Sequence, residues 1–238
     1  MLIGQKITKE YQGQEILKGV DIKVESGKIT SLIGPSGSGK TTLIRALSML
    51  DLPVSGEIIL NKEKYKFPLQ GNSIIKPWPK VSVVFQQLFL WPHLTLRENI
   101  LLSLDDLKNS RDISELIDIL QMGEFIDRYP NQVSLGQRQR AALARALALN
   151  PEYLLLDEIT SALDVEQINI ILNYLLVLRN KGMGILIVTH LLNFAQKASD
   201  NIVFLDSGKV IETGGSEILE KPQHERTKKF LSIVKQAT

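Results

Sequence analysis

The chain contains the stretch Gly34-Pro35-Ser36-Gly37-Ser38-Gly39-Lys40-Thr41, which fits the phosphate-binding pattern G-x-x-x-x-G-K-[ST] at every fixed position. An apolar run at 29–33 precedes it and residues 42–49 have helical spacing, so it should link a strand to a helix. Glycines let the backbone curl until its N–H groups face phosphate oxygens, and the helix offers those oxygens its positive end. The stretch therefore predicts a site for a nucleoside triphosphate rather than a plain Gly/Ser-rich turn.

The residue types of this phosphate loop, residues 34–41, have separate expected roles. Lys40 brings a mobile positive charge to the β and γ phosphates, and the Thr41 hydroxyl is placed to ligate Mg²⁺. The residues expected to contact the nucleotide are Gly34, Pro35, Ser36, Gly37, Ser38, Gly39, Lys40, Thr41 and Thr42.

The composition indicates an ordinary globular domain: of 238 residues, 44% are hydrophobic and 23% are charged. The formal net charge of +2 gives no general electrostatic reason to expect a nucleic-acid partner. Cysteine is absent, which excludes disulfides, thiol nucleophiles and thiolate metal sites. The three histidines, His93, His190 and His224, are too far apart in sequence for a local metal motif.

No apolar run approaches the roughly 20 residues that a membrane-spanning helix needs. Residues 1–6 also lack the charged-then-apolar layout of a secretory signal. We therefore expect the chain to remain in the cytosol and to work at a membrane only by docking onto another subunit.

The pattern of apolar runs and turn signals predicts an α/β fold. Strands are expected at 2–7, 20–24, 29–33 and 57–60, which would make a β-rich lobe around the phosphate loop. Residues 61–80 are expected to be loop or poorly predictable edge structure, and 95–149 a mainly helical insertion between strands at 83–85 and 153–156. Helices and strands then alternate, which indicates a mostly parallel sheet covered by helices. These later elements are expected at 165–179, 185–188, 191–198, 202–205 and 210–211.

Two carboxylates, Asp157 and Glu158, follow the apolar strand expected at 153–156. This position would place Asp157 at the carboxyl edge of the sheet beside the phosphate loop, where it could hold Mg²⁺ through water. Glu158 would then point toward the γ phosphate, where a carboxylate can polarise the attacking water. An isolated Asp-Glu pair is often only a solvated turn or a helix cap, but the phosphate loop favours the catalytic interpretation.

The segment at 131–140, Asn-Gln-Val-Ser-Leu-Gly-Gln-Arg-Gln-Arg, lies upstream of this strand. With it, the chain resembles the ATP-binding cassette (ABC) ATPases over nearly all of its length, because the segment resembles their signature, usually LSGGQ. The resemblance implies that Ser134, Gly136 and Gln137 bind the γ phosphate of ATP held by an opposite subunit. It also implies a head-to-tail homodimer or pseudodimer with two shared sites. Taken alone, the segment would be a Ser-capped helix start.

The resemblance implies one ABC ATPase domain over 1–238. Its P-loop NTPase core, with a mostly parallel sheet and an N-terminal antiparallel β subdomain, would comprise about 1–94 and 150–238. The helical insertion, at about 95–149, would carry the signature segment.

Four further positions match the family in order. Tyr11 stands where an aromatic stacks on adenine, and Gln86 where a glutamine reaches Mg²⁺ and the attacking water. Asp164 ends the segment 161–164, which would cross the dimer interface, and His190 would be the switch histidine at the γ phosphate. The structural alternatives are an edge-strand aromatic for Tyr11, a surface amide for Gln86, a helix cap for Asp164 and a strand-end histidine for His190.

The resemblance thus assigns catalysis and metal binding to a small set of residues. The catalytic residues would be Glu158, His190 and Gln86, and the Mg²⁺ site would comprise Thr41, Gln86 and Asp157. Two positions depart from the family. Leu135 replaces the first glycine of the signature pair, and Ile159 replaces the proline that commonly follows the catalytic glutamate.

The function implied is the ATP-hydrolysing subunit of a membrane transporter, held by transmembrane permease subunits at the cytoplasmic face of the cell (inner) membrane. The stretch 87–100 resembles the corresponding part of importers of polar amino acids. A second hypothesis is a soluble cassette ATPase acting on DNA, ribosomes or protein complexes, although the sequence has no long coiled-coil insertion, second cassette or basic arm. A third is a cassette that binds ATP as an assembly switch with little turnover, which Leu135 would favour.

Overall fold

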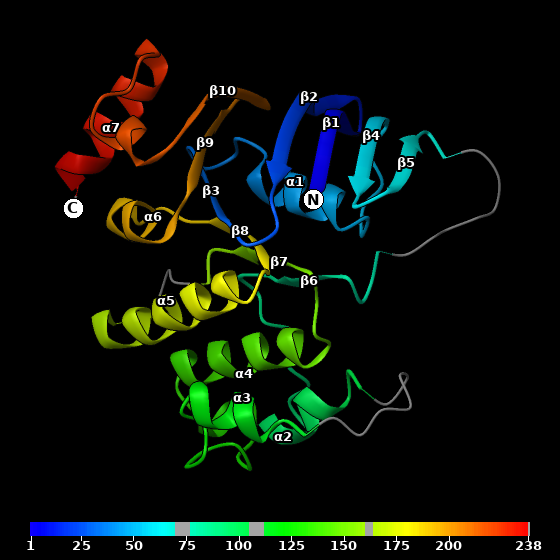
Figure 1. The fold of residues 1–238 in the computed structure, drawn as a ribbon, viewed down its shortest axis with the longest axis vertical. Coiled ribbons are helices and arrows are strands. Elements are labelled where there is room, and N and C mark those ends of the chain that lie inside the picture. The colour runs from blue at the N-terminus through cyan, green and yellow to red at the C-terminus, as the bar shows by residue number, and fades with distance from the viewer. Residues whose placement is uncertain (70–76, 105–111, 160–163, 238) are drawn as a thin grey trace.

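The computed structural model describes residues 1–69, 77–104, 112–159 and 164–237, which form two sheets with helices packed around them (Figure 1). The smaller sheet comprises β1 (Leu2–Tyr11), β2 (Gln14–Val24), β4 (Ser55–Leu60) and β5 (Glu63–Phe67). Its order is β2-β1-β4-β5, and every neighbouring pair is antiparallel.

The larger sheet has six strands. They are β3 (Ile29–Ile33), β6 (Val81–Val84), β7 (Tyr153–Asp157), β8 (Gly184–Val188), β9 (Asn201–Asp206) and β10 (Lys209–Gly214). Their order is β10-β9-β3-β8-β7-β6, parallel throughout except for the β9–β10 pair at one edge.

The helices fall into three groups (Figure 1). Helix α1 (Lys40–Leu47) lies between the two sheets, next to β1. Below the larger sheet lies a helical lobe, which we define as α2 (Leu96–Leu101), α3 (Ser114–Ile119) and α4 (Leu135–Ala148). The remaining helices are α5 (Val165–Asn180), α6 (Leu192–Ala198) and α7 (Glu225–Ala237), with short 3-10 turns at Pro130–Gln132 and Ser216–Leu219.

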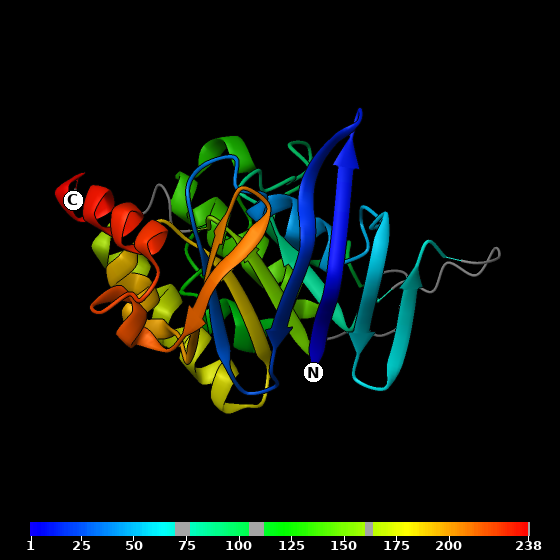
Figure 2. The ribbon, with the colours of Figure 1, turned by 90° about the horizontal axis from the view of Figure 1, so that it is seen from above.

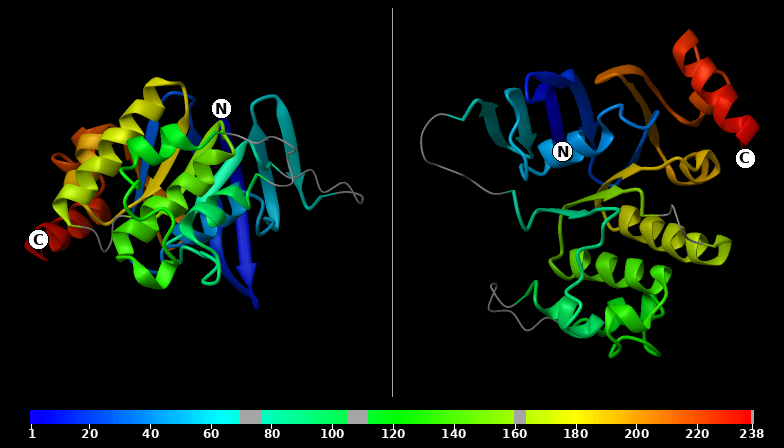
Figure 3. Two further views of the ribbon diagram at one scale, coloured as in Figure 1. Left: turned by 90° about the horizontal axis from the view of Figure 1, so that it is seen from below. Right: turned by 180° about the vertical axis from the view of Figure 1, so that it is seen from behind.

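The larger sheet carries an apolar core on each face, because successive side chains of a strand point to opposite sides. In β7, Leu154 and Leu156 join the cluster that includes α4 and α5, whereas Tyr153 and Leu155 join the cluster around α1 and the smaller sheet. Seen from below, α4 and α5 lie across one face of the sheet (Figure 3). Coverage of both faces is what parallel strands require.

The β1–β2 hairpin projects beyond β4 and β5 (Figure 2). Its two-residue turn has positive φ at both positions, 51° at Gln12 and 80° at Gly13, which is the turn geometry that fits the twist of paired strands. Tyr11 therefore pairs with Gln14 at the tip of the hairpin.

The predicted fold class is confirmed: an antiparallel sheet and a mostly parallel sheet with covering helices. Within 61–80, predicted to be loop or poorly predictable edge structure, Glu63–Phe67 form β5, the edge strand of the smaller sheet. There Tyr65 and Phe67 are buried while their neighbours Lys64 and Lys66 are exposed, an alternation too short to stand out beside Pro68. Helix α7 was not predicted. No described helix is both long enough and apolar enough to cross a bilayer.

Candidate functional site at the carboxyl edge of the sheet

The strand register brings four predicted site segments to one edge of the larger sheet. Neighbouring strands end in line, with Leu32 beside Val188, Val188 beside Asp157, and Leu156 beside Val84. Gly34, His190, Glu158 and Gln86 each follow one of these strand ends by one or two residues. Segments more than 150 positions apart in sequence thus converge where parallel α/β sheets bind their ligands.

The phosphate loop adopts the curled backbone that its glycines predict. The φ angles of Gly34, Gly37 and Gly39 are 152°, 76° and 103°. A side chain at Gly34 would place its Cβ 2.0 Å from the carbonyl oxygen of Leu205, so glycine is required there. Helix α1 begins directly after the loop, with Gly39 as its N-cap and no side chain capping its N–H groups.

Lys40 is buried inside this curl. Its Nζ donates hydrogen bonds of 2.9 Å to the carbonyl oxygens of Gly34 and Pro35. Burial lowers the pKa of Lys40, and the carboxylates of Glu158 and Asp157 act in the opposite direction. The ammonium therefore lies within the loop and close to both carboxylates.

Asp157 has the surroundings of a cation ligand. It is only 3% exposed, and its Oδ1 has no hydrogen-bond partner among the described residues. Burial raises the pKa of Asp157, whereas a hydrogen bond from the Thr41 side chain and the charge of Lys40 lower it. A buried carboxylate oxygen left unpaired beside a hydroxyl fits the oxygen ligands that Mg²⁺ prefers.

Glu158 turns away from β7 and meets His190. Its φ is 53°, its backbone N–H donates to Val188 at 3.0 Å, and its Oε1 lies 2.5 Å from His190 Nε2. The next side chain, Ile159, is 2% exposed and packs into the core. A proline at 159 would restrict the preceding residue to extended conformations, so isoleucine is compatible with this left-handed turn.

Tyr11 lies beside the start of α1, and the residue is 40% exposed. Its hydroxyl donates to Asp51, and its pKa is raised by burial and by Asp51. A side-chain hydrogen bond also links it to Thr42, next to the phosphate loop. Lys9 Nζ lies 5.2 Å from the ring centroid. The phenol is thus anchored at its hydroxyl while much of the ring faces solvent.

The signature segment forms the start of α4. Ser134 caps the helix: its hydroxyl accepts from the Gln137 N–H at 3.2 Å, and its own N–H donates to Gln137 Oε1 at 2.9 Å. Gly136 is buried, whereas Leu135 is 38% exposed. No hydrogen bond or ion pair within the described ranges joins this helix start to the phosphate loop of the same chain.

Two further predicted site residues, Gln86 and Asp164, lie at the ends of secondary-structure elements. Gln86 is exposed two positions after β6. Asp164 caps α5, accepting from the Gln167 N–H at 2.8 Å, as the structural alternative predicted. Residues 161–163, predicted to cross a dimer interface, lie outside the described residues.

The sequence did not single out three residues that support this edge. Asp51 anchors Tyr11, Asn99 bonds the backbone of 91–95, and Arg145 bonds the loop after Gln86. Their hydrogen-bond partners lie 4 to 57 positions away in the sequence, and none of the three residues stands in a recognisable sequence motif. Only the folded chain reveals these pairs.

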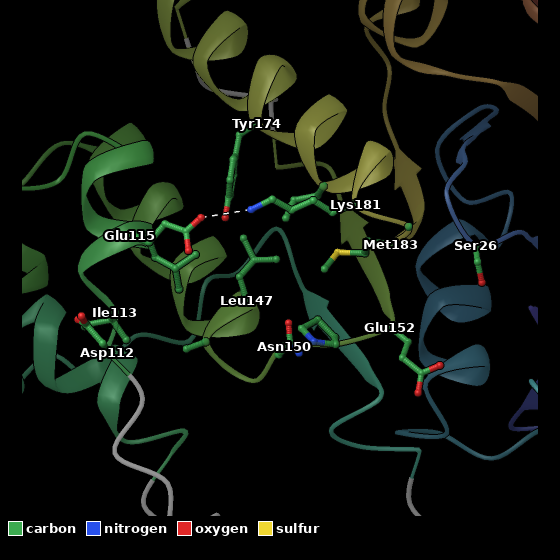
Figure 4. A pocket seen from close by; sticks show the side chains of 15 residues that line it. Ser26, Asp112, Ile113, Glu115, Leu147, Asn150, Glu152, Tyr174, Lys181 and Met183 are labelled. Atoms are coloured by element: carbon green, nitrogen blue, oxygen red, sulfur yellow. Dashed lines mark hydrogen bonds and ion pairs between the residues drawn. The ribbon is translucent and has the colours of Figure 1, made fainter.

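A cavity of about 440 Å³ lies elsewhere, between the helical lobe and α5 (Figure 4). Glu115 and Lys181 form an ion pair of 3.2 Å at its wall, and Tyr174 and Leu147 also line it. Glu152, which precedes β7, lies on its other side, so the cavity adjoins the amino end of that strand. None of the predicted nucleotide-site residues lines it.

A phosphate loop opposite two carboxylates at the carboxyl edge of a mostly parallel sheet defines a nucleotide-binding ATPase of the P-loop class. The family model described as ABC transporter matches residues 17–161. The chain belongs to this family and is an ATPase of the cassette type, as the phosphate loop and signature segment predicted.

Known relatives extend over almost the whole chain. The L-cystine import ATP-binding protein of Bacillus subtilis is 39% identical, over 98% of both chains. A glutamine transport ATP-binding protein of Escherichia coli is 34% identical, over 98% of this chain and all of its own. Among solved structures, a dimeric ATP-binding cassette with bound ADP and Pi is 31% identical, with a TM-score of 0.78 over 91% of this chain and 99% of that chain.

Proposed function

We propose that the chain hydrolyses ATP to drive uptake of a polar amino acid through a membrane transporter. The observation that carries the hydrolytic part is the Glu158–His190 contact of 2.5 Å at the edge where Lys40 and Asp157 also lie. Relatives named for cystine, arginine and glutamine transport support the substrate class, as does the stretch 87–100.

The residues of this edge divide the reaction among them. Lys40 would exchange the carbonyls of Gly34 and Pro35 for the β and γ phosphates. The attacking water would form a new bond to the γ phosphorus and pass a proton to the Glu158 carboxylate, which His190 orients. The bond between the γ phosphorus and the bridging oxygen would break, releasing ADP and inorganic phosphate.

Mg²⁺ bound here would neutralise charge on the phosphate oxygens. Asp157, with its buried unpaired oxygen, and the Thr41 hydroxyl would hold it on one side, and Gln86 would approach from the end of β6.

The start of α4 would serve the nucleotide of a second copy of the chain. Ser134, Gly136 and Gln137 have no described bond to their own phosphate loop, and the similar cassette structure is a dimer. We propose that about 95–149 form the helical subdomain that presents them, with Asp164 at the N-cap of α5, where its charge acts on Arg140 of α4. Leu135 would then contact the partner copy.

An exposed apolar patch supports docking of a transmembrane permease subunit from the cytoplasmic face of the membrane. The patch consists of Leu50, Trp78, Phe85 and Phe89: the first three line one groove of about 240 Å³, and the Phe89 ring lies 6.1 Å from that of Phe85. Three of its side chains, Leu50, Trp78 and Phe89, are more than 40% exposed. Exposed clusters of this kind mark interaction surfaces.

Uptake by intact cells tests the substrate class. Cells lacking the chain should lose uptake of one labelled amino acid among cystine, arginine and glutamine, and the parental chain should restore it, whereas Glu158→Gln should not. Unchanged uptake of all three, together with ATPase activity stimulated by nucleic acid, would instead support the soluble alternative.

Tyr11→Ala should weaken binding of ATP and GTP alike, because stacking recognises a flat ring more than its substituents. The expected loss is about 1–3 kcal/mol, by analogy with base–aromatic stacking. Calorimetric titration measures it, and Tyr129→Ala, which removes a tyrosine of similar exposure (42%) away from the phosphate loop, is the control for ring loss elsewhere. Equal affinity of Tyr11→Ala and the parent would leave Tyr11 as an edge-strand aromatic.

A further inference from the structure

Arg145, near the carboxyl end of α4, bonds the loop that follows Gln86. Its Nη2 donates to the carbonyl oxygen of Leu88 and its Nη1 to that of Phe89, each at 2.7 Å. Two donors of one planar guanidinium therefore hold two successive peptide carbonyls. Burial lowers the pKa of Arg145.

The held segment needs such support. Phe89 has φ 49°, in the left-handed region that a bulky residue rarely occupies. Such a conformation persists only where its surroundings fix it. Arg145 bonds the carbonyl of Phe89 itself, so the guanidinium acts directly on this turn.

A second side chain fixes the other half of the loop. Asn99, fully buried on α2, accepts from the Trp91 N–H at 2.7 Å and donates to the carbonyls of Trp91, Leu94 and Thr95 at 2.9–3.1 Å. The segment 88–95 is thus fastened to two helices of the helical lobe, and Gln86 lies where it departs toward β6.

We infer that Arg145 is a positioning residue, which holds the left-handed turn at Phe89 and so sets where Gln86 stands at the nucleotide edge. Arg145 and the signature residues share α4, so the same helix links Gln86 in one site to the Ser134 end proposed to serve the other site. The inference rests on the proposed roles of Gln86 and Ser134. Its structural part, the hold on the loop, does not.

Arg145→Lys in the full-length chain separates these parts. Lysine keeps the charge but cannot present the planar fork. Hydrogen exchange at the amides of Trp91 and Leu94 should become at least about tenfold faster, because the loop opens more often. ATP turnover should fall about tenfold through misplacement of Gln86, while ATP affinity stays within about twofold.

Arg140→Lys is the matched control. Arg140 lies on the same helix and also bonds two backbone carbonyls, those of Leu120 and Gln121, at 3.0 Å. It does not touch the loop after Gln86. Because Arg140 ends the segment 131–140 that resembles the family signature, this control concerns the loop alone. Exchange at Trp91 and Leu94 should stay within about twofold of the parent.

Three outcomes would overturn the inference. Unchanged exchange at Trp91 and Leu94 in Arg145→Lys would show that the guanidinium does not hold the loop. Faster exchange with parental turnover would show that the loop does not position Gln86, and equally faster exchange at Trp91 and Leu94 in Arg140→Lys would make the role generally structural. Hydrogen exchange at the amides of β7 checks folding, and if it also becomes faster, Arg145→Gln replaces the lysine variant.

A parent without ATPase activity would refute the proposed function and, with it, the part of the inference that concerns Gln86. The exchange result would still decide whether Arg145 holds the loop.

Discussion

Glu158→Gln should bind MgATP about as tightly as the parent and lose roughly 10²- to 10⁴-fold in hydrolysis, as expected for a lost general base. The substitution keeps the shape of the side chain and removes the carboxylate that receives the proton. Binding should survive because Lys40, Thr41 and Asp157 remain. Since the two copies should separate only after the ATP between them is hydrolysed, the variant should accumulate as an ATP-bound dimer. Light scattering detects the dimer, and calorimetry measures the binding of MgATP.

A variant that is inactive but stays monomeric at saturating MgATP would show that the shared site needs its membrane partner. Greatly weakened ATP binding would place Glu158 among the binding residues and contradict its assignment as the base.

Lys40→Ala should abolish hydrolysis and weaken ATP binding by at least about tenfold, because it removes charge-assisted hydrogen bonds worth roughly 1.5–3 kcal/mol each. In the structure, the Lys40 ammonium lies within the phosphate loop and donates hydrogen bonds to the carbonyl oxygens of Gly34 and Pro35. Titration with ATP and a phosphate-release assay measure the two effects.

Lys28→Ala is its control. Lys28 precedes the amino end of β3, whereas Lys40 follows the carboxyl end of that strand. The ion pair between Lys28 and Glu25 is exposed. Its loss should change ATP binding by less than about twofold. Parental turnover in Lys40→Ala would defeat the phosphate-loop assignment.

Local patterns in the sequence predicted the parts of the site that local backbone chemistry determines. The phosphate loop needs glycines at fixed spacing, and Asp157 and Glu158 follow an apolar strand directly. Their convergence also followed from the sequence, because parallel strands bring their carboxyl ends to one edge. The Glu158–His190 contact could not be predicted, since it depends on the left-handed turn at Glu158.

Elements defined by tertiary packing were harder to predict. Strand β5 exists because Tyr65 and Phe67 reach the core of the smaller sheet, although Pro68 and Gly71 nearby indicate loop. In α7, Phe230 and Leu231 pack against residues of β9 and β3 in the larger sheet, and many of their neighbours in sequence are charged. Asp51 and Arg145 act on residues 40 and 56–57 positions away, which no local pattern reports. The roles toward a partner copy remain predictions.

Phosphate release at saturating MgATP, compared among the parent, Glu158→Gln and Glu152→Gln, tests the central claim most directly. Glu152→Gln makes the same chemical change just before the opposite end of β7. Hydrolysis at the carboxyl edge predicts equal rates for the parent and Glu152→Gln, and a rate roughly 10²- to 10⁴-fold lower for Glu158→Gln. Equal rates in all three proteins would contradict it.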